Sequence, residues 1–259
     1  MELTPQILLI VLPLVFLGGF VDSVAGGGGL VTLPAYLMAG IPAHLAMGTN
    51  KVVNGVGTAT ASLRYFRGGR VRLRPALISG VGALAGAAVG TRIALLIPED
   101  ALKLMMLVAL PCAAVLLVLK KDFGKDTAVA AREFTPRQEA VRSGLIGLLL
   151  GCYDGLIGPG TGTFMIMAFT MALSMDLLTS SGCAKVANLA SNVASAVLFI
   201  FSGKVWWLLA LPAAVCNALG AFCGARYAMR GGSEKVRGMI FVVLGLLFIK
   251  MLFELLGLG

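Results

Sequence analysis

Long apolar stretches separated by short polar loops run along the whole chain. They predict ten hydrophobic segments, which lie at residues 5–21, 29–43, 45–66, 75–97, 101–119, 141–153, 161–174, 179–201, 205–226 and 236–256. A helix needs about 20 residues to cross a bilayer, so the longer segments can span one. At a rise of about 1.5 Å per residue, the segments at 29–43 and 161–174 are too short for a full span. Both follow glycine clusters, and we interpret them as half-helices or as arms of re-entrant hairpins.

The composition agrees with a membrane protein. Of the 259 residues, 58% are hydrophobic and only 13% are charged, whereas soluble domains are nearer to half apolar and a quarter charged. The core of a chain this short could not bury so many uncharged runs. The sequence therefore predicts an all-α polytopic membrane protein.

The net charge of +9 comes from basic residues that lie between the apolar segments, mainly at 67–74, 120–140 and 226–237. This is the positive-inside pattern of membrane proteins, and we do not expect nucleic-acid binding. The pattern places these three regions in the cytoplasm and the acidic turn at 98–100 outside. It also places both chain termini outside.

The second half of the chain repeats the first. At an offset of 132 residues, three residues near the first glycine cluster have counterparts near the second: Asp22 with Asp154, Gly26 with Gly158 and Gly28 with Gly160. Further along, at an offset of 134 residues, three more positions correspond: Lys51 with Lys185, Asn54 with Asn188 and Arg70 with Lys204. We therefore divide the chain into a first membrane repeat (1–120), a cytoplasmic linker (121–140) and a second repeat (141–259). Because each half holds five segments, an odd number, the second repeat is expected to be inverted, as in many secondary transporters.

Each repeat carries an aspartate four residues before its glycine cluster, inside an apolar stretch. Successive N–H groups of such glycines can converge on an anion, and the following helix adds its positive end. The alternative is a tight turn needed only for packing. The candidate substrate-binding residues are Gly26, Gly27, Gly28, Gly29, Asn50, Lys51 and Asn54 in the first repeat, and Gly158, Gly160, Thr161, Lys185, Asn188 and Asn192 in the second.

The charged candidates have several roles open to them. Lys51 and Lys185 can bind an anion directly, pair with an aspartate of their own or the opposite repeat, or extend toward the nearest membrane surface. Asp22 and Asp154 can pair with a lysine, cap a short helix or carry a proton in coupling. No catalytic residue and no metal site is expected, because the lone histidine lies at a helix start and the cysteines form no CxxC motif.

The segments GFVDSVAGGGGLVTLP (19–34) and GTNK (48–51) resemble the TauE/SafE family of sulfite exporter-like permeases, most closely its YfcA-like branch. The second half agrees at Tyr153-Asp154-Gly155, Gly158-Pro159 and Ala184-Lys185. The resemblance implies a transporter of a small anion, such as sulfite or an organosulfonate, in the bacterial inner membrane. Pro159 and Thr161 depart from the glycine run of the first copy, so the two half-sites are not equivalent.

We therefore expect a secondary transporter working by alternating access, with a small-anion channel of the same architecture as the alternative. An enzyme is disfavoured and no cofactor is expected. The expected partners are the anionic substrate and the lipid bilayer. The substrate's identity, the direction of transport, the coupling ion and any homo-oligomer are left open by the sequence.

Overall fold

The computed structural model of the chain describes residues 3–106, 108 and 134–255, with no side-chain detail for residue 237 and residues 240–255. Within these ranges the protein is all-helical. The helices are α1 (Pro5–Ala25), α2 (Gly29–Met38), α3 (Ala43–Arg67), α4 (Leu73–Leu96), α6 (Pro136–Leu156), α7 (Thr161–Leu173), α8 (Leu177–Phe201) and α9 (Trp207–Leu255). Residues 99–106 are also helical. Most of the segment predicted at 101–119 and of the linker at 121–140 lies outside the described residues.

Local sequence signals set several helix boundaries. Both halves begin with a Thr-Pro pair: Thr4 accepts a hydrogen bond from the N–H of Ile7, and Thr135 forms a capping box with Gln138. A side-chain oxygen at this position satisfies an N–H group that the first helical turn leaves unpaired. α1 ends at Gly26, whose φ of 81° is a left-handed conformation that favours glycine.

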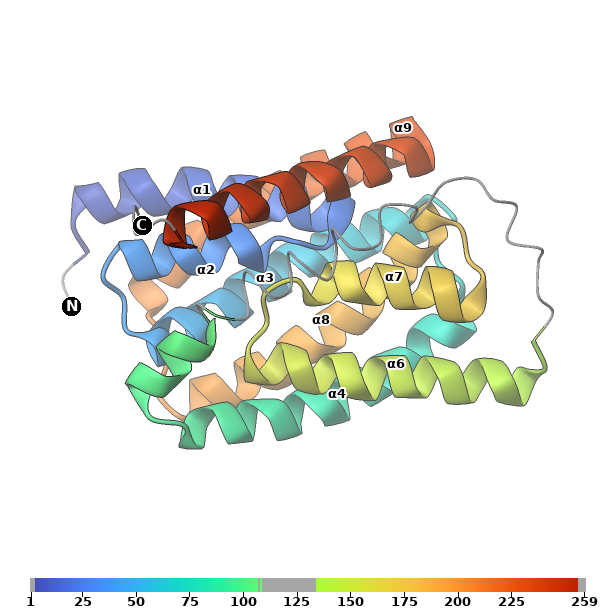
Figure 1. Cartoon of the computed structure of the whole chain (residues 1–259), viewed down its shortest axis with the longest axis horizontal. Coiled ribbons are helices and arrows are strands. Elements are labelled where there is room, and N and C mark those ends of the chain that lie inside the picture. The colour runs from blue at the N-terminus through green and yellow to red at the C-terminus, as the bar shows by residue number, and fades with distance from the viewer. Residues whose placement is uncertain (1–2, 107, 109–133, 256–259) are drawn as a thin grey trace.

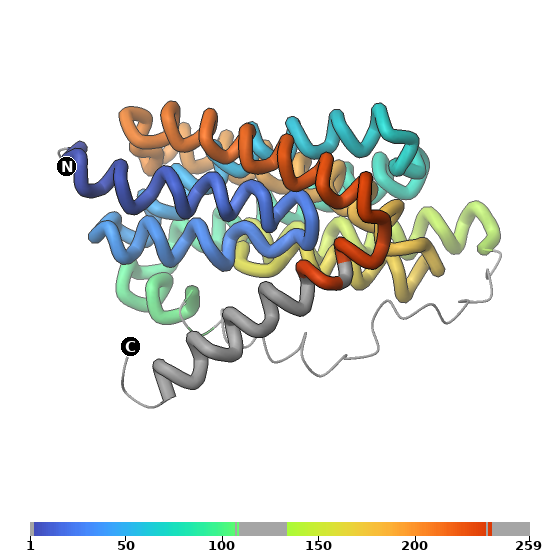
Figure 2. Tube along the Cα trace, turned by 90° about the horizontal axis from the view of Figure 1, so that it is seen from above, coloured from blue at the N-terminus to red at the C-terminus, as the bar shows by residue number. Residues whose placement is uncertain are grey.

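The two short helices are arms of hairpins. α1 and α2 enter from one end of the molecule and return toward it, whereas α6 and α7 do the same from the opposite end (Figure 1). α3 and α8 run the length of the molecule between them (Figures 1 and 2). Of the alternatives that the sequence left open for 29–43 and 161–174, the structure thus shows hairpin arms.

Four helices in the described part of the chain are long and apolar enough to cross a membrane. They are Pro5–Ala25, Leu73–Leu96, Leu177–Phe201 and the Trp207–Val236 part of α9. α9 consists of two helices that meet at Gly232, whose φ of 63° and ψ of −160° are not helical, and these correspond to the two segments predicted at 205–226 and 236–256. The structure thus confirms the predicted all-α membrane fold.

Glycines allow helices of different halves to approach closely. α4 packs on α6 with Gly86 against the backbone of Leu148, and α1 packs on α9 with Gly220 against the backbone of Phe16. A Cβ atom added at Gly86 would lie 2.1 Å from the carbonyl oxygen of Leu148. Small residues bring helix backbones into direct van der Waals contact, which drives helix association in lipid.

The contacts between the halves follow the sequence repeat. A Cβ atom at Gly48 would meet the carbonyl oxygen of Lys204, and one at Gly182 would meet that of Arg70. Gly48 and Gly182 are counterparts in the repeat, as are Arg70 and Lys204. The same contact therefore occurs twice with the halves exchanged, which is compatible with the predicted repeat, and the inversion of the second repeat stays a prediction. The orientation of each half in a membrane stays a prediction.

The basic loops gather at one end of the molecule. The α3–α4 loop, the start of α6, the α7–α8 loop and the bend in α9 lie together at this end, which we call the basic end (Figures 1 and 2). The start of α1 and the turns after α4 and α8 lie at the other. The basic end holds Arg67, Arg70, Arg137, Arg230 and Lys235, in agreement with the predicted common side of these loops.

We expect Gly86→Ala to destabilise the protein by about 1–3 kcal/mol, because the added methyl group forces α4 away from the backbone of α6. Gly144→Ala is the matched control: it also lies at this interface, but its nearest neighbour would be the Ile78 side chain at 3.8 Å. Thermal unfolding in detergent measures the stability of both variants. Equal melting temperatures for the two variants would contradict the close-packing role of Gly86.

Candidate functional site

The turns at the tips of the two hairpins touch each other near the middle of the molecule. A Cβ atom at Gly26 would lie 2.2 Å from the carbonyl carbon of Gly162, and one at Gly162 would lie 2.5 Å from the carbonyl oxygen of Gly26. The Thr163 hydroxyl donates a hydrogen bond of 2.8 Å to the carbonyl of Ala25. Backbone therefore meets backbone, and both glycines are required for this contact.

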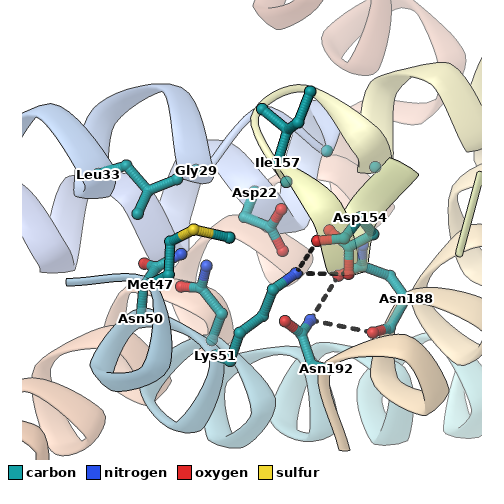
Figure 3. A pocket seen from close by; sticks show the side chains of 14 residues that line it. Asp22, Gly29, Leu33, Met47, Asn50, Lys51, Asp154, Ile157, Asn188 and Asn192 are labelled. Carbon is teal, nitrogen blue, oxygen red and sulfur yellow. Dashed lines mark hydrogen bonds and ion pairs between the residues drawn. The ribbon is translucent and has the colours of Figure 1, made fainter. Parts of the chain in front are cut away.

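A lysine from the first half pairs with an aspartate of the second. Lys51 on α3 places its Nζ 2.7 Å from Oδ2 of Asp154, near the end of α6, and 2.6 Å from the Asp154 carbonyl oxygen (Figure 3). The hydroxyl of Ser191 on α8 donates to the same carboxylate oxygen at 2.7 Å. Both charged side chains are almost fully buried, at 4% and 5% exposed. Burial of this kind is tolerated only when each charge is paired and hydrogen-bonded.

The second ion pair crosses in the opposite direction. Lys185 on α8 places its Nζ 2.7 Å from Oδ2 of Asp22 on α1, and the lysine side chain is fully buried. The N–H of Gly28 donates to the other carboxylate oxygen at 3.4 Å. Each lysine thus pairs with the aspartate of the opposite half. Of the roles open to them in the sequence, the four groups are charge partners in this structure.

A small cavity lies between the hairpin tips and the two crossing helices (Figure 3). Its volume is about 20 Å³, which is room for about one water molecule. Its lining is Asp22, Gly26, Gly29, Leu33, Met47, Asn50, Lys51, Asn54, Asp154, Ile157, Gly158, Gly162, Asn188 and Asn192. The Lys51–Asp154 pair therefore forms part of its wall, whereas Lys185 lies behind Asp22 and does not reach it.

Two helices begin at this cavity. α2 starts at Gly29 and α7 at Thr161, and Gly29 and Gly162 both contribute to the wall. The N–H groups of Leu30, Val31 and Thr161 already bond to carbonyls of the preceding turns. Both helix ends therefore contribute mainly the partial positive charge of the helix dipole to the cavity. Two such ends beside one ammonium group form an environment suited to an oxyanion.

Asparagines supply the remaining polar wall. The side-chain oxygen of Asn50 accepts a hydrogen bond from Thr32 at 2.7 Å, and that of Asn54 accepts one from Asn217 at 3.3 Å. Their NH₂ groups are therefore the atoms that can donate to an anion. Asn192 donates to the Asn188 side chain at 2.8 Å, which links the two amides of α8.

The structure brings most of the predicted site residues together. Ten of them line the cavity: Asp22, Gly26, Gly29, Asn50, Lys51, Asn54, Asp154, Gly158, Asn188 and Asn192. Those that do not are Gly27, Gly28, Gly160, Thr161 and Lys185. The hydroxyl of Thr161 is used within its own turn, where it donates to the Gly158 carbonyl at 2.7 Å.

Sequence analysis missed Leu33, Met47, Ile157, Gly162 and Ser191. Met47 lies one helical turn before Lys51, and Leu33 lies one turn after Gly29, so helical spacing could have suggested both. Ser191 lies one residue before Asn192, and the Ser191-Asn192 pair is part of the second half's resemblance to the TauE/SafE family, which could have suggested it. In the described ranges, no group of three His, Cys, Asp or Glu side chains is placed to hold a metal ion.

A comparison with protein-family models identifies the family of this chain. The family model described as Sulfite exporter TauE/SafE matches residues 11–251. The chain belongs to the TauE/SafE family. The resemblance found in the two glycine motifs is thereby confirmed over nearly the whole chain.

The curated relatives of the chain are named as probable membrane transporters. A probable membrane transporter protein, ORF9, of Sinorhizobium sp is 37% identical over 92% of this chain and 89% of its own length. A probable membrane transporter protein of Haemophilus influenzae is 32% identical over 98% of both chains. The probable membrane transporter protein YfcA of Escherichia coli K12 is 29% identical over 97% of this chain and 91% of its own length. No solved structure matches the chain.

We expect Lys185→Met to destabilise the protein by about 3–5 kcal/mol, since the Asp22 carboxylate, whose side chain is only 14% exposed, loses its partner. The double variant Lys185→Met/Asp22→Asn removes both charges and should recover most of the lost stability. Thermal unfolding of both variants in detergent tests this. If the double variant were no more stable than the single one, the pair would not be the structural element that its burial indicates.

Proposed function

We propose that this TauE/SafE member is a secondary transporter that moves a small anion across the bacterial inner membrane by alternating access. The observation that carries the proposal is the buried cavity at which two helix N-termini and the Lys51 ammonium converge. The asparagine NH₂ groups add neutral donors. Together they offer an oxyanion hydrogen-bond donors and positive charge at the centre of a membrane fold.

The substrate class that we propose is sulfite or an organosulfonate. The family description names sulfite export, and a sulfur oxyanion presents three acceptor oxygens to such a set of donors. The apolar side chains of Leu33, Met47 and Ile157 line the same cavity. They suit the short carbon chain of an organosulfonate.

The cavity of about 20 Å³ is too small for such an anion. Binding therefore requires the two hairpins to move apart. In alternating access, the cavity opens toward only one end of the molecule at a time. In this proposal the halves are inverted repeats, the basic end faces the cytoplasm and both termini lie outside. A closed centre favours a transporter over a permanently open channel.

The charge balance of the site suggests how anion binding is coupled to proton binding. Lys51, Asp154, Lys185 and Asp22 sum to zero when all are ionised, so an entering anion leaves one unbalanced negative charge at membrane depth. The anion competes with Asp154 for Lys51. Protonation of Asp154 removes that competition and restores neutrality. Anion binding and proton binding then favour each other, and the proton is the coupling ion.

We expect Lys51→Gln to abolish concentrative uptake of sulfite or an organosulfonate by proteoliposomes, because it removes the positive charge of the cavity wall. Lys204→Gln is the control: it makes the same change at an exposed residue outside the cavity and should transport normally. Binding of the same anions measured by thermal shift should be lost in parallel. Undiminished uptake by the Lys51 variant would refute the proposed site.

We expect anion affinity to rise as pH falls in the wild-type protein and to become independent of pH in Asp154→Asn, whose amide cannot take up a proton. The charged groups around Asp154 are Lys51 on α3 and the Asp22–Lys185 pair on α1 and α8. Methanesulfonate is the suitable probe, because its own charge does not change over the range tested. A variant with the wild-type pH profile would exclude Asp154 as the proton carrier.

A further inference from the structure

A second pocket, separate from the central cavity, lies at the basic end where α9 bends beside α1. Its volume is about 390 Å³. It is lined by Phe20, Cys223, Arg226, Tyr227, Arg230, Gly231 and Lys235. Three of these side chains are cationic, and none of the described residues that line it is acidic.

The bend in α9 brings the three cations together. Arg226 and Arg230 are four residues apart and lie on one face of the helix. Lys235 follows the bend, yet its Nζ lies 4.9 Å from the ring centroid of Tyr227, eight residues earlier in sequence. The change of direction at Gly232, visible in Figure 2, folds Lys235 back over the arginine-bearing turn.

Two glycines make this fold-back possible. Gly232 has a φ of 63°, in the left-handed region that favours glycine. A Cβ atom at Gly231 would lie 1.8 Å from Cγ of Lys235, so the lysine side chain crosses the space that any other residue would fill. The position of Lys235 in the pocket therefore depends on glycine at 231.

The pocket has an apolar side as well as a cationic one. The rings of Phe20 and Tyr227 pack with centroids 5.7 Å apart and link α1 to α9. Both helices are candidate membrane spans, and Arg230 and Lys235 lie near the end of the α9 span at Val236. Apolar surface of two candidate spans thus adjoins positive charge near the end of the α9 span.

We infer that this pocket binds the phosphate of an anionic phospholipid, such as phosphatidylglycerol. The arginines and Lys235 contact the phosphate, while the glycerol and acyl chain lie on the Phe20 and Tyr227 rings. Basic pockets between transmembrane helices on the cytoplasmic side are suited to this ligand. A soluble phosphate would use the cations but would leave the aromatic side of the pocket unfilled.

The test compares lipid binding by full-length variants in mixed micelles. Phosphatidylglycerol, phosphatidylcholine and glycerol 3-phosphate are titrated, and bound ligand is counted by native mass spectrometry. We expect wild-type protein to bind phosphatidylglycerol in preference to the other two. At roughly fivefold per basic side chain, Arg226→Gln/Arg230→Gln should weaken this binding about 25-fold.

Two further variants separate a built pocket from general surface charge. Arg67→Gln/Arg70→Gln makes the same charge change at the same end of the molecule and should leave phosphatidylglycerol binding nearly unchanged. Gly231→Ala changes no charge but displaces Lys235, and it should weaken binding several-fold. Equal loss in both arginine double variants, no effect of Gly231→Ala, or equally tight binding of glycerol 3-phosphate would each overturn the proposal.

Discussion

Two buried ion pairs that cross between the halves are the interactions on which the rest of the structure depends. A lone lysine or aspartate at membrane depth is costly, and the cost is reduced only if a partner lies within hydrogen-bonding distance. Lys51 reaches its partner because the α6–α7 hairpin extends inward from one end, and Lys185 reaches its own because α1 and α2 extend from the other. The glycine contact between the two tips then follows, since any larger residue at Gly26 or Gly162 would hold the hairpins apart.

The two pairs are related by the sequence repeat but not by their surroundings. Lys51 and Asp154 both line the cavity, whereas Lys185 is enclosed behind Asp22. Repeat counterparts differ as well. Ser191, which donates to Asp154, corresponds to Gly57, whose missing side chain leaves room for the Asn217 amide. Counterpart positions of the repeat thus surround the two pairs with different neighbours, and only in the Lys51–Asp154 pair do both partners line the cavity.

The sequence was sufficient for the helical membrane fold, because apolar runs of spanning length and basic loops follow directly from the physics of the bilayer. It also identified ten residues of the cavity wall, since aspartate, lysine and glycine are conspicuous in such runs. It could not decide whether Lys51 pairs with Asp22 or Asp154, because each aspartate lies near the end of a helix that leads into a glycine cluster. The choice depends on how the hairpin tips pack, which is a tertiary property. The fold-back of Lys235 at Gly231 was hidden for the same reason.

The closed, neutral site constrains the proposed transport cycle. An anion cannot simply enter, because the cavity has space for little more than a water molecule and its one accessible ammonium is already paired. Separating the hairpins without a new partner for Lys51 would expose two unpaired charges at membrane depth. An anion that takes the place of Asp154 supplies that partner, and a proton on Asp154 neutralises the carboxylate that is displaced. In the proposed cycle, opening is therefore least costly when anion and proton are both present, and electroneutrality of the opened site is what couples the two.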